Sequence, residues 1–87
     1  MIMDALRKKL IFRAWHRGTR EMDIIMGRFA ESHVPSFDDA RLRQFEELLG
    51  ENDPDLYDWL VGKETAPERC DHAVMQALRD FHLNKKN

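Results

Sequence analysis

The sequence predicts an all-α protein, and three observations support this fold class. Apolar residues recur at helical spacing, no segment alternates apolar and polar residues as a half-buried strand would, and glycine or proline separates the helical stretches. The 87 residues suit one domain, residues 1–87, with a thin core. With 43% hydrophobic and 34% charged residues, the composition is typical of a soluble helical protein.

The first two helices meet at a glycine. The first is expected over about residues 4–16, because Asp4 is a good N-cap and apolar residues follow at helical spacing. Gly18 interrupts that pattern. The second helix is expected over about residues 19–32, and it ends where a proline follows, because the residue before proline avoids helical geometry.

The third helix is expected over about residues 38–49, and its N-terminus has two alternative signals. Asp38 is one candidate N-cap, whereas Ser36 together with Asp39 would form a variant of the capping box. The sequence does not choose between them. Gly50 is a plausible C-terminal stop.

Proline marks the start of the last two helices. The fourth is expected over about residues 53–61, with Asp53 as N-cap and Pro54 as first helical residue. The fifth is expected over about residues 67–83, opened by Pro67. Short connections between the five helices predict neighbours that pack antiparallel or at steep angles.

The charge is distributed unevenly. Residues 1–28 carry seven basic and three acidic residues, residues 29–71 carry four and twelve, and residues 72–87 carry three and one. Two explanations fit this pattern equally well. The charges either lie on ordinary solvated helix faces or form a surface that docks on one protein partner. A nucleic-acid partner is not expected, since phosphate binding favours a basic net charge and this chain has −2.

No motif predicts catalysis, a metal site or a bound cofactor. The four histidines lack metal-ligand spacing, the single cysteine, Cys70, has no partner for a CxxC pair, and the four glycines form no phosphate-binding loop. We therefore expect no catalytic residue, no metal ligand and no stably bound cofactor. No apolar stretch is long enough to span a bilayer, and no signal peptide or presequence is evident.

A charged cluster surrounds the glycine between the first two helices. It comprises Arg17, Gly18, Arg20, Glu21 and Asp23. A structural explanation makes Gly18 the N-cap and Glu21 the N3 residue of a capping box, with Arg17 paired to Glu21. That explanation leaves Arg20 and Asp23 without a role, so the cluster also predicts a recognition point.

Three motifs resemble the SdhE-type flavinylation factors, also called succinate dehydrogenase assembly factor 2. Arg17-Gly18-x-x-Glu21 resembles the RGxxE signature, and residues 53–60 (DPDLYDWL) resemble the DPDLxxWL block. Residues 74–81 (VMQALRDF) are similar to the last-helix segment of eukaryotic members. The motifs occur in family order and span nearly the whole chain.

The resemblance implies a compact five-helix bundle without catalytic activity of its own. Members assist covalent attachment of FAD to the flavoprotein subunit of succinate dehydrogenase, and in bacteria of the related fumarate reductase. FAD is the cofactor of that partner, which also supplies the receiving histidine. The resemblance makes Arg17, Gly18 and Glu21 partner-binding residues, and Arg20 and Asp23 would extend the patch.

The expected setting is the cytoplasm of a bacterium, or the mitochondrial matrix for a mature organellar form, and the free protein is expected to be a monomer. Two other functions stay open. One is a generic helical adaptor that binds another protein through the acidic middle. The other is a protein that delivers FAD itself, with Trp15, Tyr57 and Trp59 as stacking candidates. The Lys85-Lys86 tail receives no role.

Overall fold

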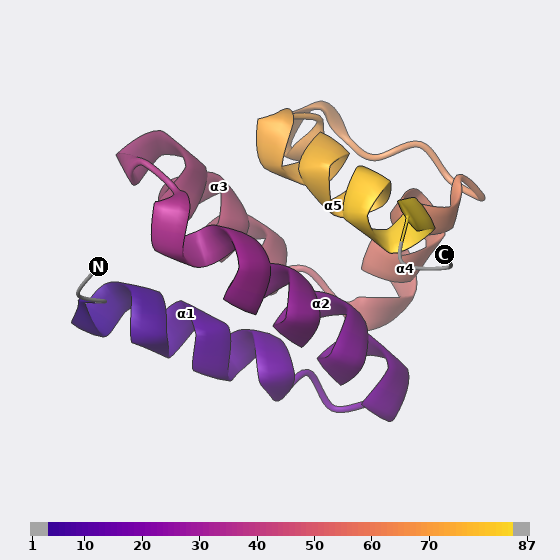
Figure 1. Ribbon diagram of the computed structural model, residues 1–87. Coiled ribbons are helices and arrows are strands. Elements are labelled where there is room, and N and C mark those ends of the chain that lie inside the picture. Colours follow the sequence, from indigo (N-terminus) through magenta and orange to yellow (C-terminus); the bar gives the residue numbers. More distant parts are fainter. Residues whose placement is uncertain (1–3, 85–87) are drawn as a thin grey trace.

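The computed structural model describes residues 4–84, and this range is all-α (Figure 1). The predicted fold class is confirmed: five α-helices and two short 3₁₀ helices occur there, without a β-strand. The tail residues Lys85 and Lys86 lie outside the described residues. The elements, in order, are α1 (Ala5–Trp15), α2 (Arg20–His33), η1 (Val34–Ser36), α3 (Asp39–Leu49), α4 (Asp53–Val61), η2 (Glu68–Cys70) and α5 (Ala73–Asn84).

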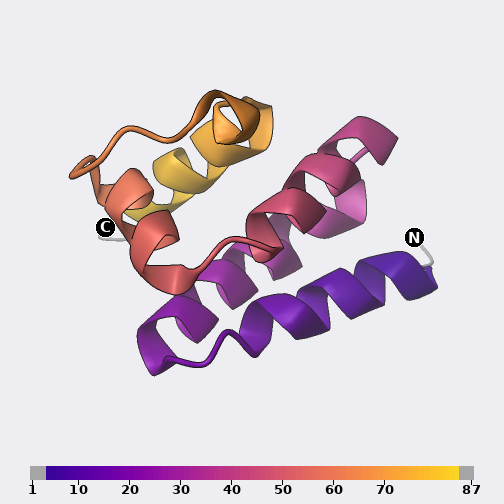
Figure 2. The ribbon, with the colours of Figure 1, turned by 180° about the vertical axis from the view of Figure 1, so that it is seen from behind.

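The helices pack around α2. Helices α1 and α2 form an antiparallel hairpin and share the most extensive contact in the structure (Figure 1). Helix α5 packs against α2, α3 and α4 and so closes the opposite side of the bundle. Seen from behind, the α1–α2 junction and the α3–α4 junction lie toward the same end of the molecule (Figure 2). That end carries the candidate site.

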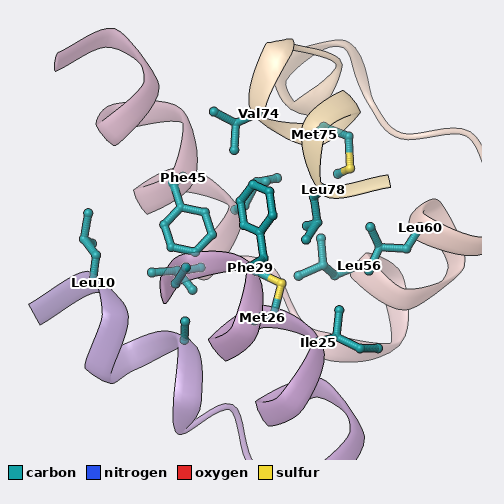
Figure 3. Packing of buried hydrophobic residues seen from close by; sticks show 14 of the residues in the cluster. Leu10, Ile25, Met26, Phe29, Phe45, Leu56, Leu60, Val74, Met75 and Leu78 are labelled. Carbon is teal, nitrogen blue, oxygen red and sulfur yellow. The ribbon is translucent and has the colours of Figure 1, made fainter. Parts of the chain in front are cut away.

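An aromatic centre organises the core (Figure 3). The Phe29 ring lies 5.7 Å from the Phe45 ring and 5.7 Å from the Phe81 ring, measured between centroids. Such tilted and edge-on pairs add about 0.5–1.5 kcal/mol each beyond the area that they bury. All buried residues among those described are apolar, so polar groups at the surface, not in the core, distinguish the faces of the bundle.

The N-caps confirm two sequence predictions and correct two others. Asp4 accepts from the Arg7 N–H at the start of α1, and Asp38 accepts from the Arg41 N–H at the start of α3. Asp38, not Ser36, is therefore the cap of the third helix. The prediction of Gly18 as cap of the second helix is wrong, because the Thr19 hydroxyl accepts from the Met22 N–H.

The cap of α4 also differs from the prediction. Asn52 occupies the N-cap position and its Oδ1 accepts from the Asp55 N–H at 2.9 Å. Asp53 is the first helical residue, and its carboxylate turns to Arg17. The prediction failed because aspartate and asparagine cap helices about equally well, and a long-range ion pair decides between them.

The prediction that the fifth helix opens at Pro67 is wrong. The segment Glu68–Cys70 forms a 3₁₀ turn, and Asp71 leaves helical geometry with φ −91° and ψ 78°. Helix α5 begins only at Ala73. The preceding residue, His72, caps it, because its Nδ1 accepts a hydrogen bond from the Met75 N–H at 3.1 Å. Pro67 therefore precedes a separate short turn and not the fifth helix.

Candidate partner-binding site

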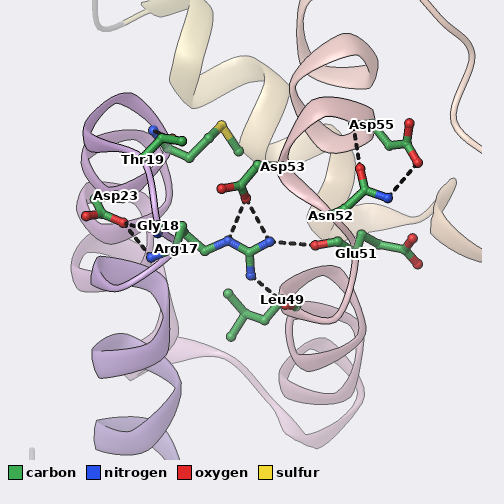
Figure 4. A network of polar contacts seen from close by, with 10 residues as sticks. Arg17, Gly18, Thr19, Asp23, Leu49, Glu51, Asn52, Asp53 and Asp55 are labelled. Atoms are coloured by element: carbon green, nitrogen blue, oxygen red, sulfur yellow. Dashed lines mark hydrogen bonds and ion pairs between the residues drawn. The ribbon is translucent and has the colours of Figure 1, made fainter.

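The guanidinium of Arg17 joins the α1–α2 junction to the α3–α4 junction (Figure 4). Its Nε donates to Asp53 Oδ1 at 2.9 Å, and its Nη2 forms an ion pair with the same oxygen at 2.9 Å. Nη1 donates to the Leu49 carbonyl and Nη2 donates to the Glu51 carbonyl. One planar fork thus satisfies a carboxylate and two carbonyls near the end of α3, which is geometry that lysine cannot reproduce.

This arrangement corrects the predicted role of Arg17. The side chain of Arg17 is only 9% exposed, and that of Asp53 is 16% exposed. The predicted pairing of Arg17 with Glu21 is wrong, because Asp53 on another helix takes its place. Arg17 therefore holds two loops together, and little of its charge faces solvent.

Asp23 fixes the backbone of the same junction from within α2. Its Oδ1 accepts from the Arg17 N–H and, at 3.3 Å, from the Gly18 N–H. These bonds reach backward along the chain from the first turn of the helix. A carboxylate there also interacts favourably with the positive end of the helix dipole. Asp23, which the capping explanation left without a role, is thus a clamp on the junction.

Gly18 is required by backbone geometry. Its φ is +118°, a region that L-residues with a side chain rarely adopt. A Cβ built on Gly18 would meet no atom within 4 Å. The constraint is therefore conformational and not a close approach within the chain.

Arg20 and Glu21 are the exposed members of the cluster. Within residues 4–84, neither side chain forms a hydrogen bond or ion pair. Glu21 lies on the rim of a hollow of about 280 Å³ between the first turns of α2 and α4. The hollow is lined by Thr19, Glu21, Met22, Asp53, Pro54 and Tyr57. The structure thus separates the five predicted residues into two exposed charges and three that shape the junction.

Sequence reasoning missed a second network behind the junction. The Glu51 carboxylate accepts from Arg69 at 3.1 and 3.2 Å and from the Cys70 thiol at 3.5 Å. The Arg69 hydrogen bond lowers the pKa of Glu51. Burial, followed by the charge of Glu51, raises the pKa of Cys70. Glu51 therefore binds Arg17 through its backbone carbonyl and binds η2 through its carboxylate. No short sequence motif predicts these contacts.

A larger hollow lies elsewhere, along α1. It measures about 560 Å³ and is lined by Lys8, Ile11, Phe12, Trp15, His16 and Glu31. The Trp15 indole lies on Gly27, where a Cβ would overlap the indole ring, and its Nε1 donates to Glu31 Oε2 at 2.9 Å. One face of this indole is therefore already covered.

No group of three or more histidine, cysteine, aspartate or glutamate side chains within residues 4–84 is placed to hold a metal ion. Among the described helices, none combines the length and the apolar character needed to cross a membrane.

Fold and site together define a small helical protein with two exposed charges, Arg20 and Glu21, at a corner that internal hydrogen bonds hold in place. This is the build of a protein-binding module. Comparison with known proteins identifies the family. Residues 8–82 match the family described as flavinator of succinate dehydrogenase, and the chain belongs to it. The match covers all five α-helices of the described structure in whole or in part.

Individual relatives come from bacteria and from mitochondria. The chain is 44% identical over 66 residues to the FAD assembly factor SdhE of Acetobacter pasteurianus, covering 76% of this chain and 61% of the relative. It is 31% identical over 82 residues to the mitochondrial succinate dehydrogenase assembly factor 2 of Dictyostelium discoideum, covering 94% and 58%. For the Cryptococcus neoformans protein of the same name, identity is 41% over 64 residues, covering 74% and 37%. The chain thus spans less than two thirds of each of these relatives.

Proposed function

We propose that this chain binds the flavoprotein subunit of succinate dehydrogenase, and in bacteria that of the related fumarate reductase, and promotes covalent attachment of FAD. The observation that carries the proposal is the family match over residues 8–82, which includes both the Arg17–Glu21 corner and the Asp53 block that supports it. Names of bacterial and mitochondrial relatives describe assembly factors, in keeping with an accessory role.

Within the site, we assign direct contact to the exposed side chains of Arg20 and Glu21 and to the backbone at Gly18. Arg17 and Asp23 act through these residues, because their polar atoms are already bonded within the chain. A free, exposed carboxylate such as Glu21 can accept charge-assisted hydrogen bonds from a partner, and each is worth about 1.5–3 kcal/mol.

Such an energy suffices for a chaperone mechanism. Flavin attachment requires the isoalloxazine and the receiving histidine of the flavoprotein to be held in reactive geometry. If this chain prefers the competent arrangement of its partner by only about 1.4 kcal/mol, the population of that arrangement relative to others rises about tenfold. One or two contacts at the corner supply a difference of this size, without any chemistry on this chain.

The proposal assigns neither catalysis nor a stably bound cofactor to this chain, and FAD remains the cofactor of the partner. The three aromatic residues considered for flavin stacking support this assignment. Trp59 is only 7% exposed, Tyr57 packs against the core, and Trp15 already stacks on Gly27. Titration of the chain with FAD is expected to leave its tryptophan fluorescence without a saturable change, whereas tight quenching would favour FAD delivery.

Location and oligomeric state follow the same proposal. The chain works as a monomer that meets its client in the bacterial cytoplasm or in the mitochondrial matrix. Relatives from both settings support this pair of locations. The acidic net charge of −2 does not favour nucleic acid as an alternative partner.

Covalent flavin in cells tests the proposed function. The flavoprotein subunit is separated by denaturing electrophoresis, and its flavin is detected by ultraviolet fluorescence in strains with and without this gene. We expect the band to disappear on deletion and to return with wild type but not with Glu21→Ala. A band of unchanged intensity in the deletion strain would refute the function.

A further inference from the structure

The hollow between α2 and α4 has two carboxylates in its lining. Glu21 and Asp53 stand on its two sides, and no basic residue is among the lining residues. Glu21 is unpaired within residues 4–84. Asp53 uses Oδ1 for Arg17, while its Oδ2 accepts no hydrogen bond from the described part of the chain.

The helix dipoles do not reverse this charge. Both α2 and α4 point their N-termini toward the hollow, and each terminus contributes roughly half a positive charge. Four first-turn carboxylates oppose them, namely those of Glu21, Asp23, Asp53 and Asp55. Of these four, Glu21 and Asp53 line the hollow itself. Arg17 neutralises one of the four. Arg20 is absent from the lining, as expected for a side chain that points about 100° away from Glu21 around the helix.

The remaining walls are apolar and aromatic. Met22 is buried at the base, Pro54 forms an exposed rim, and Tyr57 is partly buried against the core. A tyrosine ring beside a carboxylate suits a cation with an aliphatic stem, because the stem packs on apolar surface while the head meets the carboxylate and the ring face. A small neutral group would leave Glu21 without a partner.

We infer that this hollow receives an arginine or lysine side chain of the flavoprotein client, bound by Glu21 and packed against Tyr57 and Pro54. The inference rests on the proposed function and adds the chemistry of the contact. It gives the Asp53 block two roles, since Asp53 anchors Arg17 on one side and lines the hollow on the other. It also explains why an exposed glutamate stands at the first turn of α2 without any partner in the described part of its own chain.

Affinity for the purified flavoprotein subunit provides the first test. Glu21→Gln keeps the shape of the side chain and removes its charge, so we expect the Kd to rise at least tenfold. Glu64→Gln is the matched control, because Glu64 is exposed just beyond the C-terminal end of α4, and its Kd should stay within twofold of wild type. Neither substitution touches the core, so circular dichroism should be unchanged.

Photocrosslinking identifies the occupant. The photoreactive amino acid p-benzoylphenylalanine is placed at Pro54 on the rim or, as a control, at Val61, which is exposed at the far end of the same helix. We expect Pro54 to crosslink to a flavoprotein segment that contains an arginine or lysine, and Val61 to give no such product. Reversing the charge of that residue should abolish binding, and Glu21→Arg should restore it.

Several outcomes would overturn the inference. Glu21→Gln that binds within twofold of wild type, or Pro54 crosslinks confined to a segment without arginine or lysine, would refute the hollow as a cation site while leaving the proposed function intact. Failure of the wild-type chain to bind the flavoprotein would refute both. The wild-type control therefore distinguishes the two failures.

Discussion

Replacing Arg17 by alanine is expected to destabilise the fold strongly, although Arg17 belongs to the motif predicted to bind a partner. The side chain is only 9% exposed, and its guanidinium bonds one carboxylate and two carbonyls. Its removal leaves the Asp53 charge and the carbonyls of Leu49 and Glu51 without their donor. The role of Arg17 is therefore structural. Its loss should lower the free energy of unfolding directly and affect partner binding only as a consequence.

The magnitude follows from these contacts. Breaking a buried ion pair by removing one partner costs about 3–5 kcal/mol. The 16% exposure of Asp53 lets water reach the orphaned carboxylate, so the lower value, about 3 kcal/mol, applies. A domain of this size has a total stability of roughly 4–13 kcal/mol. A loss of about 3 kcal/mol should lower the Tm by roughly 12–24 °C.

Urea and thermal unfolding followed by circular dichroism measure this loss. Arg13→Ala is the matched control on the preceding helix α1, since Arg13 pairs with Glu46 at 3.9 Å and the two side chains are 37% and 51% exposed. That substitution should cost less than about 1 kcal/mol. Arg17→Lys should fall between the two, because it keeps a charge but loses the planar fork. Equal stabilities for Arg17→Ala and Arg13→Ala would refute the structural role of Arg17.

Three further predictions concern single residues. Gly18→Ala should destabilise the chain by about 1 kcal/mol or more because of the positive φ. D-alanine at the same position, introduced by chemical synthesis, should restore the wild-type Tm. Equal effects of L-alanine and D-alanine would exclude a conformational role for Gly18. Gly27→Ala should displace the Trp15 indole, which occupies the space that the new methyl group needs. The free energy of unfolding should fall by about 1–3 kcal/mol, and the tryptophan emission should shift. An unshifted spectrum would contradict the packing of Trp15 on Gly27. Burial lowers the pKa of His72 below its usual value of about 6.5. The unfolded chain therefore binds a proton at this histidine more readily than the folded chain does. The contribution of neutral His72 to the free energy of unfolding is fully present above about pH 6.5 and should be lost as the pH falls below that value. His72→Asn keeps a helix-capping side chain that does not titrate, and it should show a smaller loss in chemical denaturation between pH 7.5 and pH 5; the same loss as in wild type would refute the assignment.

Local chemistry made the helices predictable. Asp4 and Asp38 cap their helices as expected, and the glycine and proline positions mark most connections. Helical spacing of apolar residues needs only neighbours a few positions apart, so it survives in any fold that buries one face of each helix. The all-α fold class follows from such short-range information.

Two of the errors, the cap of α4 and the partner of Arg17, arose because distant residues compete for one group. Asp53 was expected to cap its own helix, but Arg17, 36 positions earlier in the chain, binds its carboxylate. Asn52 then takes the cap. Pairing of this kind depends on how the α1–α2 and α3–α4 junctions meet in space, and sequence spacing carries no information about that.

The sequence predicted where the candidate site lies, but it did not predict which of the site residues are exposed. The five residues around Gly18 do lie at one corner, because they are neighbours in the chain. Their division into exposed charges and internal supports was not predictable, since Arg17 and Arg20 are the same residue type and only tertiary packing buries one of them. The hollow beside Glu21 likewise requires α4, which is distant from Glu21 in the sequence.

The most direct test of the proposed function is the rate of covalent flavin attachment in a purified system. Flavoprotein subunit lacking covalent flavin is mixed with FAD, alone or with wild type, Glu21→Gln or Glu64→Gln, and the flavin that survives denaturation is measured over time. We predict that wild type and Glu64→Gln raise the rate at least tenfold, and that Glu21→Gln loses most of that gain while keeping a native Tm. An equal rate with and without the wild-type chain would contradict the account.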